Sequence, residues 1–274
     1  MKIFSDYRMK IGMSCLLMIM VSILLAPWIT PYDPLEINIQ QALLPPSLHH
    51  LFGLDENGAD VLSQVLHGAR ISLGIAFIVV LINLLIGLTI GSISAWMGSV
   101  VDQIFMRIVE LLSAFPRFLL ALAILAMLGT SIYHLILVLC ISGWTGFARL
   151  VRAEILHLKN EDYVLGAMSY GANSVRIIVR HIWPNLLGVL LVQIFFSLIG
   201  AIISEAGLSF LGLGLPPEIP SWGRLLNSGR QVLMEAPHLS LLPGLTLLIV
   251  ILGFQCCADA LKDHFNPQTK QRLI

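Results

Sequence analysis

The stretch that decides the fold is residues 71–97, ISLGIAFIVVLINLLIGLTIGSISAWM, which contains no Asp, Glu, Lys or Arg. A bilayer core about 30 Å thick takes roughly 20 helical residues to cross, so this run is long enough to span it. Hydrocarbon offers no hydrogen-bond partners to a backbone, and a spanning run must therefore be helical. Residues 11–29 and 239–258 are equally free of charge. The pattern predicts an all-α, polytopic membrane protein.

The composition agrees with this class. Hydrophobic residues make up 57% of the 274 residues and charged residues 12%, against about 25% charged in soluble domains. A chain of this size forms one helical bundle, with little left for a soluble domain. The four cysteines all lie inside apolar runs, so they are expected to be packing residues rather than a disulfide framework or a metal site.

The number of spans depends on how the apolar run in the middle of the chain divides into helices. Residues 118–148 carry no charge, but this run is too long for one span and too short for two. The turn signal Gly129-Thr130-Ser131 divides it, which predicts helices over about 104–128 and 132–148. Six spans result, over 11–29, 71–97, 104–128, 132–148, 186–212 and 239–258.

The basic residues indicate which side each loop faces. With six spans and a cytoplasmic N-terminus, 13 of the 16 Lys and Arg residues fall inside, Arg117 among them, and three fall outside: Arg70, Arg224 and Arg230. Cytoplasmic loops carry the excess of Lys and Arg in membrane proteins. Five spans would move the basic segment 149–185 outside, so the charges favour six spans with both termini cytoplasmic.

This topology divides the chain into three parts. Residues 1–70 hold the first span and an outer segment, residues 71–258 the transmembrane core, and residues 259–274 a cytoplasmic tail. Within the core, residues 149–185 form a 37-residue inner loop. Connections of that length are uncommon unless they have a role of their own, so this loop is the first candidate functional feature.

Several motifs, spread in order over residues 30–267, resemble those of one family. The inner loop has a short helix, then Gly171, then a basic stretch that ends in His181-Ile182-Trp183-Pro184. It looks like the cytoplasmic Glu-Ala-Ala loop of permease subunits in binding-protein-dependent ABC importers; aligned on Gly171, that motif falls on Leu165, Gly166 and Ala167. Five other segments are similar to the dipeptide, oligopeptide and nickel branch, in the shorter of its two permease subunits: residues 52–73, 114–116, 209–214, 220–223 and 259–267.

The resemblance implies a pathway subunit with the ABC importer permease fold. It implies import of peptides, nickel or a metal chelate across a bacterial cytoplasmic membrane. The implied partners are a second permease subunit, two ATPase subunits and an external substrate-binding protein. The chain itself is expected to be no enzyme, with no catalytic residue, metal or cofactor. It lacks the Gly-x-x-x-x-Gly-Lys-Ser/Thr phosphate-binding loop, so ATP hydrolysis would belong to a partner.

A short helix over about 162–172 is expected to dock on the ATPase. Its acidic start suits the positive end of a helix dipole, and Tyr163, Val164, Ala167 and Met168 form one apolar face at helical spacing. The alternative is that Gly171 only ends a helix in an ordinary connector. The residues expected to couple the two subunits are Asp162, Tyr163, Leu165, Gly166, Ala167, Met168, Gly171, Arg180 and His181.

Polar residues inside the spans are few. Glu205 lies in the apolar run 186–212, and intramembrane ionisable groups usually face a cavity or a partner. It is therefore the candidate for the pathway, and a position in water near the outer surface is the alternative. Asn83 is expected to form an interhelical hydrogen bond, and Gly87 with Gly91 a helix-packing face.

Two other functions fit a polytopic membrane protein. A membrane-embedded enzyme would need a motif such as His-Glu-x-x-His, which the sequence lacks. An ion-coupled secondary transporter often carries inverted repeats and charges at mid-membrane, and neither is evident. The adjacent pair His49-His50 is weak evidence for a metal-ligand set. The motifs together favour the importer permease.

Overall fold

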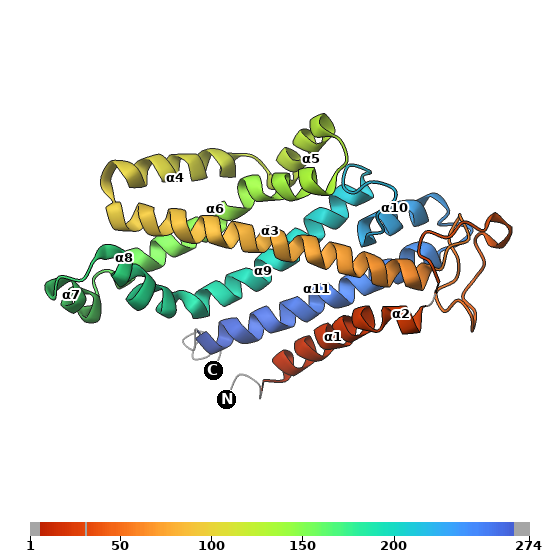
Figure 1. Ribbon diagram of the computed structural model, residues 1–274, viewed down its shortest axis with the longest axis horizontal. Helices are drawn as coiled ribbons and strands as arrows, with labels where there is room; N and C mark the ends of the chain where they lie inside the picture. Colours follow the sequence, from red (N-terminus) through yellow and green to blue (C-terminus); the bar gives the residue numbers. More distant parts are fainter. Residues whose placement is uncertain (1–5, 31, 266–274) are drawn as a thin grey trace, which may run out of the picture.

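The computed structural model describes residues 6–30 and 32–265. Within these residues there is no β-strand, and long helices lie side by side in one elongated bundle (Figure 1). The helices are α1 (Tyr7–Leu24), α2 (Ala26–Ile29), α3 (Val61–Met97), α4 (Ser99–Ala114), α5 (Arg117–Leu128), α6 (Ile132–Leu158), α7 (Asp162–Ser169), α8 (Ser174–Ile177), α9 (Trp183–Phe210), α10 (Trp222–Gln231) and α11 (His238–Phe265), with a 3-10 turn at Ile39–Gln41 and a π-helical turn at Ile178–Ile182.

Five helical segments of the described chain are long and apolar enough to cross a membrane: α1, α3, α6, α11 and the segment Ser174–Phe210 that ends in α9. The helices α4 and α5, of 16 and 12 residues, are too short to span alone. They make a sixth span only as a pair, which is bent by 80° at the break between them. The all-α membrane bundle is thus confirmed, but the single helix expected over 104–128 is wrong. Pro116 accounts for the break, since proline pushes the residue before it out of the α conformation, and Phe115 is extended at φ −94° and ψ 137°.

The helices also reach beyond the apolar runs that predicted them. α3 begins at Val61 rather than at 71, because the Asp60 carboxylate caps it by accepting the N–H of Ser63 at 2.8 Å. α6 continues to Leu158, and the helical segment that leads into α9 begins at Ser174. The inner loop expected over 149–185 therefore shortens to 159–173, and α7 lies within it. The expected tail is helical as far as Phe265, and its remainder lies outside the described residues.

The centre of the bundle is the contact between α3 and α6. A Cβ atom added at Gly87 would lie 2.3 Å from the Cβ of Phe147, and one at Gly91 would lie 2.7 Å from the carbonyl oxygen of Ala148. Only a residue without a side chain lets the two helices approach this closely. The helix-packing face predicted from Gly87 and Gly91 is therefore confirmed.

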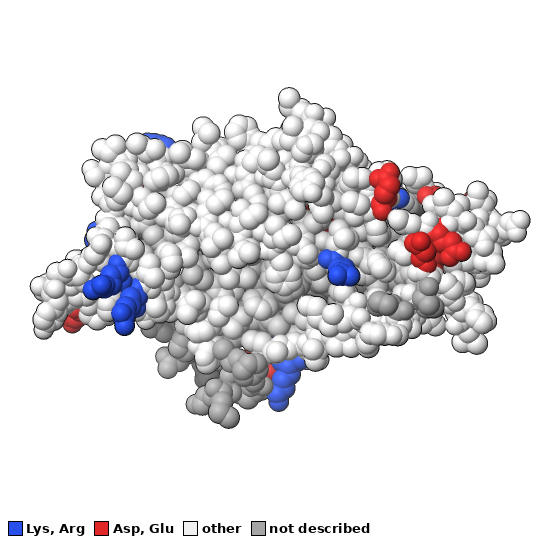
Figure 2. Space-filling model, in the orientation of Figure 1, with Lys and Arg blue, Asp and Glu red and all other residues white. Residues whose placement is uncertain are grey.

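Charged residues gather at the two ends of the bundle (Figure 2). On the face shown, Lys and Arg lie mostly toward the end where α7 projects, and Asp and Glu toward the end with the outer segment, while the surface between is almost free of charge. Both ends of the described chain lie nearer the α7 end (Figure 1). The ion pair Arg8–Asp263, at 3.2 Å, joins α1 to α11 there.

Candidate functional site

A half-open cavity of about 270 Å³ lies between helices of the bundle, beside the break between α4 and α5. Arg117, Phe118, Phe196 and Gly200 in its lining are exposed. Four helices form its walls, namely α3, α5, α6 and α9. Most of its lining is apolar or small, which suits a space within a membrane bundle. The polar side chains that line it are Asn83, Arg117, Ser142, Gln193, Ser197 and Ser204.

Arg117 is the charged residue of this cavity. It is the first residue of α5, directly after Pro116, and its Nη2 donates to the Oγ1 of Thr145 on α6 at 3.2 Å. The ion pairs formed among the described residues do not include it. The cytoplasmic charges of the predicted topology include Arg117, but the helix break places it at the wall of this half-open cavity, where it is exposed. The asymmetry of the remaining basic residues still favours six spans.

Asn83 on α3 faces the same cavity. Its side chain is buried, with 5% of its surface exposed, and its Oδ1 has no hydrogen-bond partner in the described part of the chain. The amide instead lies against Gly143 of α6, where an added Cβ would be 2.1 Å from Nδ2. The expected interhelical hydrogen bond is thus replaced by a close approach of two helices.

Glu205 does not line this cavity. It is fully buried, and its Oε1 accepts a hydrogen bond from the Oγ of Ser209 at 2.9 Å. The hydroxyl groups of Ser72 and Ser221 also face its carboxyl group, which places it between α3, α9 and the start of α10. Its neighbour Ser204 does line the cavity, because successive helical side chains point about 100° apart. Neither position expected for Glu205, in the cavity or in outer water, is the one observed.

The helix α7 projects from one end of the bundle (Figure 1). Its Val164 is fully buried, and Ala167 and Met168 pack partly buried against the core of the same chain. Leu165 and Tyr170 point outward, with 46% and 94% of their surfaces exposed. The apolar face expected to meet a partner is therefore largely turned toward the chain itself, and the outward face consists of other residues.

Gly171 ends this helix in a Schellman motif. Its N–H donates to the carbonyl oxygen of Met168 at 2.9 Å, and the N–H of Ala172 donates to that of Ala167 at 3.1 Å. The motif needs a left-handed residue, and Gly171 has φ +77°. α7 therefore stops at Ser169 rather than near 172, and the structure explains Gly171 as a helix stop.

Two hydrogen bonds join α7 to the following span. Asn185 Nδ2 donates to the phenol oxygen of Tyr163 at 3.2 Å and to the carbonyl oxygen of His181 at 2.7 Å. Burial, and secondarily the charge of Glu161, raise the pKa of Tyr163, so the phenol stays neutral at physiological pH. His181 and the exposed Arg180 belong to the π-helical turn that leads into α9.

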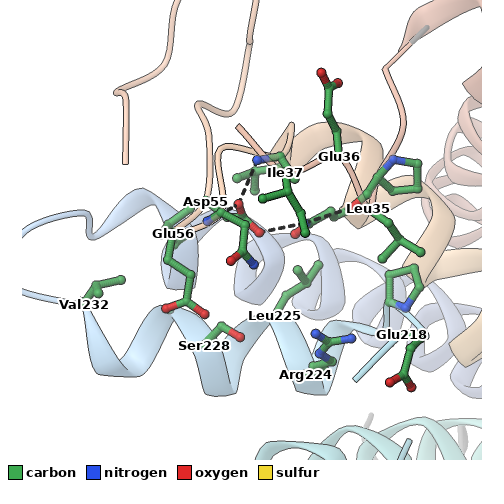
Figure 3. Close-up of a pocket in the computed structure, with 18 residues that line it drawn as sticks. Leu35, Glu36, Ile37, Asp55, Glu56, Glu218, Arg224, Leu225, Ser228 and Val232 are labelled. Atoms are coloured by element: carbon green, nitrogen blue, oxygen red, sulfur yellow. Dashed lines mark hydrogen bonds between the residues drawn. The ribbon is translucent and has the colours of Figure 1, made fainter. Parts of the chain in front are cut away.

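A second cavity, of about 290 Å³, lies at the opposite end of the bundle (Figure 3). The sequence motif that begins at Phe52 supplies part of its wall. Asp55 is held there by Gln64, whose Nε2 donates at 2.8 Å. Burial lowers the pKa of Arg224, and nearby carboxylates oppose that shift. The charged residues around this cavity are Glu36, Asp55, Glu56, Glu218 and Arg224.

The pair His49-His50 lies in this outer region as well. The Nδ1 of His50 is 3.0 Å from the Oδ1 of Asp60. Across the described residues, no three His, Cys, Asp or Glu side chains come together as a possible metal-ligand set.

Comparison with known protein families shows which family the chain belongs to. Residues 87–271 match the family described as binding-protein-dependent transport system inner membrane component. The chain belongs to this family. Residues 8–46 also match the N-terminal TM domain of oligopeptide transport permease C. This inner membrane component is thus a multi-pass permease subunit of an ABC importer, in agreement with the resemblance carried by its motifs.

Relatives of this inner membrane component extend over most of the chain. The dipeptide transport system permease protein DppC of Alkalihalophilus pseudofirmus is 37% identical over 89% of this chain and 81% of its own length. The oligopeptide transport system permease protein OppC of Bacillus subtilis is 35% identical over 97% and 88%. A crystal structure of an amino acid ABC transporter aligns with a TM-score of 0.56 over 73% of this chain and 94% of its own, and at 18% identity it shows the fold alone.

Proposed function

We propose that this permease subunit forms one half of the pathway of a peptide importer. Its partners would be a second permease subunit, two ATPase subunits and an external substrate-binding protein. The observation that carries the proposal is the match to permeases named for dipeptide and oligopeptide transport over nearly the whole chain. The half-open cavity at the α4–α5 break supports it, because several polar side chains line it in an otherwise apolar bundle.

The inner loop would couple this subunit to an ATPase through α7. Leu165 and Tyr170 offer exposed apolar surface, while the buried Val164 and the hydrogen bond from Asn185 to Tyr163 hold the helix in place. Asp162, Gly166, Arg180 and His181 would flank the contact. The segment Ser174–Phe210 runs from the end of this loop to the cavity. A displacement of α7 on ATP binding would therefore reach Gln193 and Ser197 at the cavity wall, as alternating access requires.

The α7 end of the bundle would face the cytoplasm, together with both termini. The asymmetry of Lys and Arg supports this orientation. In a variant without native cysteines, single cysteines at the exposed positions Ser47 and Glu218 should react with an impermeant reagent added outside intact cells. A cysteine at Asn160, exposed at the start of the α7 loop, should not. Labelling of Asn160 from outside would overturn the orientation and the ATPase contact together.

The proposed assembly is tested by purification and uptake. The chain, affinity-tagged in its native membrane, should bring down a second permease and ATPase subunits. Reconstituted with the binding protein, the complex should import a labelled dipeptide only when ATP is supplied. Dipeptide uptake by the purified chain alone would contradict the assembly, and uptake of nickel or a nickel chelate without uptake of peptides would contradict the substrate class.

A further inference from the structure

A groove of about 170 Å³ opens between α1 and α3. It lies at the end of α1 that leads into α2, away from the end of the bundle where α7 projects (Figure 1). Its lining is apolar apart from one imidazole and one guanidinium group on α3, and it includes no acidic residue. The residues that line it are Ile23, Leu24, Ala26, Leu66, His67 and Arg70.

Arg70 places a positive charge in this groove without an ion partner. It is exposed, and the ion pairs formed among the described residues do not include it. The next residue, Ile71, begins the charge-free run 71–97. A guanidinium group at such a boundary extends to the headgroup region or to a partner, because hydrocarbon does not solvate it. His67 lies one turn before Arg70 and adds a ring nitrogen that can donate a hydrogen bond.

The length of α1 indicates the depth of the groove in the membrane. With 18 residues, α1 is about 27 Å long, close to the roughly 30 Å of a hydrocarbon core. Its last turn, with Ile23 and Leu24, therefore lies near one edge of the core. Trp28 follows on α2 with 78% of its surface exposed, and tryptophan is enriched at this interface. Since Arg70 lines the same groove as this last turn, it lies at the level of the lipid phosphates.

An apolar face of α3 continues from Arg70 into the membrane. Phe77, Ile78 and Leu81 follow at helical spacing on the side of Arg70, and each has about half of its surface exposed. Between them and Arg70 lies Gly74, where an added Cβ atom would meet nothing within 4 Å. The guanidinium group thus stands above an open, uncharged surface, which matches a molecule with an anionic head and an acyl chain.

We propose that the groove between α1 and α3 binds an anionic phospholipid, with its phosphate on Arg70 and His67 and an acyl chain along the α3 face below. Arginine is suited to phosphate by its charge and its planar fork of donors. The groove has no carboxylate to hold the amine of a zwitterionic headgroup, so a lipid with net negative charge is favoured. In the orientation proposed above, this lipid belongs to the outer leaflet. Because α1 is the least buried of the candidate spans, a lipid that contacts both helices would strengthen its attachment to α3.

The test uses photoreactive lipids, because they report where on the protein a lipid lies. The permease, purified with the subunits that accompany it, is reconstituted into phosphatidylcholine vesicles. A trace of phosphatidylglycerol or of phosphatidylcholine with a diazirine in its acyl chain is added, and the labelled peptides are mapped after illumination. The ratio of phosphatidylglycerol to phosphatidylcholine labelling over residues 74–81 should be roughly five, as one basic contact at the surface supplies. Residues 245–252 of α11, an exposed face far from the groove in sequence, should give a ratio near one.

Three variants make the pattern specific to the guanidinium group. Arg70→Gln should reduce the ratio over residues 74–81 to that of residues 245–252. Arg70→Lys should retain most of the preference, because an ammonium group also binds phosphate. Arg230→Gln removes another exposed basic residue, on α10 and outside the groove lining, and should change the ratio less than twofold.

A ratio near one in the unmodified permease, or a ratio that Arg70→Gln leaves unchanged, would overturn the lipid site. Loss of the preference on addition of excess glycerol 3-phosphate would overturn it in favour of a site for soluble phosphate compounds. Failure of both lipids to label residues 74–81, with normal labelling of α11, would show that another subunit covers the groove. None of these results depends on which cargo the transporter imports, so the proposed function stands or falls separately.

Discussion

Arg152 on α6 and Asp102 on α4 form a two-pronged ion pair, in which the Nε–Oδ1 and Nη2–Oδ2 distances are both 2.5 Å. The hydroxyl group of Ser94 on α3 also donates to Asp102. Beside it, Lys159 Nζ donates to the carbonyl oxygen of Trp96 at 3.1 Å and lies 5.0 Å from the centre of its ring. These contacts hold α3, α4 and α6 together at the end of the bundle from which α7 projects.

Asp102→Asn should lower the free energy of unfolding by about 1–2 kcal/mol, because it removes the charge from partly exposed, charge-assisted hydrogen bonds. Thermal unfolding in detergent would measure this, with Arg152→Gln completing a double-mutant cycle. The pair Arg107–Glu110 on the same helix is the control, since its side chains are 83% and 64% exposed. Glu110→Gln should change the free energy of unfolding by less than about 0.5 kcal/mol. Equal losses of stability in Asp102→Asn and Glu110→Gln would contradict a stabilising role for the Arg152–Asp102 ion pair.

Gly87→Ala should destabilise the bundle by about 1–3 kcal/mol, because the new methyl group would meet the Cβ of Phe147 and the backbone of α6. Gly74 on the same helix is the matched control, since a Cβ added there meets nothing within 4 Å. Gly74→Ala should be neutral or stabilising, as alanine has the higher helix propensity. Unfolding in detergent should separate the two variants, and similar stabilities would argue against close packing of α3 on α6.

Much of the bundle could be predicted because its signal is local. A long charge-free run predicts most of a helix such as α3 or α11, and the asymmetry of Lys and Arg predicts the number of spans. Pro116 also indicates a break, since proline restricts the residue before it. The apolar run continues through Pro116, however, and favours a single helix.

The functional sites depend on contacts that a linear pattern does not contain. Helical spacing predicts that Val164 and Met168 share a face, but only tertiary packing decides that this face turns inward. The same holds for Glu205, whose hydroxyl neighbours Ser72 and Ser221 come from distant segments. The cavity around Arg117 follows from the helix break, so a single helix over 104–128 does not predict it.

Glu205→Gln should be tolerated, whereas Glu205→Ala should lower the free energy of unfolding by about 2–4 kcal/mol. The amide has nearly the shape of the carboxyl group and still accepts from Ser209, while alanine leaves a void and unpaired hydroxyl groups. Abundance in the membrane and thermal unfolding would measure both. Similar losses in the two variants would show that the negative charge, rather than the packed hydrogen-bonded group, is required.

The last prediction concerns the outward face of α7. In Leu165→Ala with Tyr170→Ala, abundance and thermal stability should stay near normal, because exposed positions rarely change stability by more than about 0.5 kcal/mol. Uptake and substrate-stimulated ATPase activity should fall several-fold, since truncating an aromatic anchor of an interface commonly costs about 2 kcal/mol or more.

Variants of the inward side and of the helix stop give the contrasting pattern. Ala167→Arg would force a charge against the core of the same chain, and Gly171→Leu would place a side chain at φ +77°. Both should therefore lower stability as well as uptake. Normal uptake and normal ATPase stimulation in the Leu165 and Tyr170 double variant would mean that this face is only solvated, and that the ATPase contacts the subunit elsewhere.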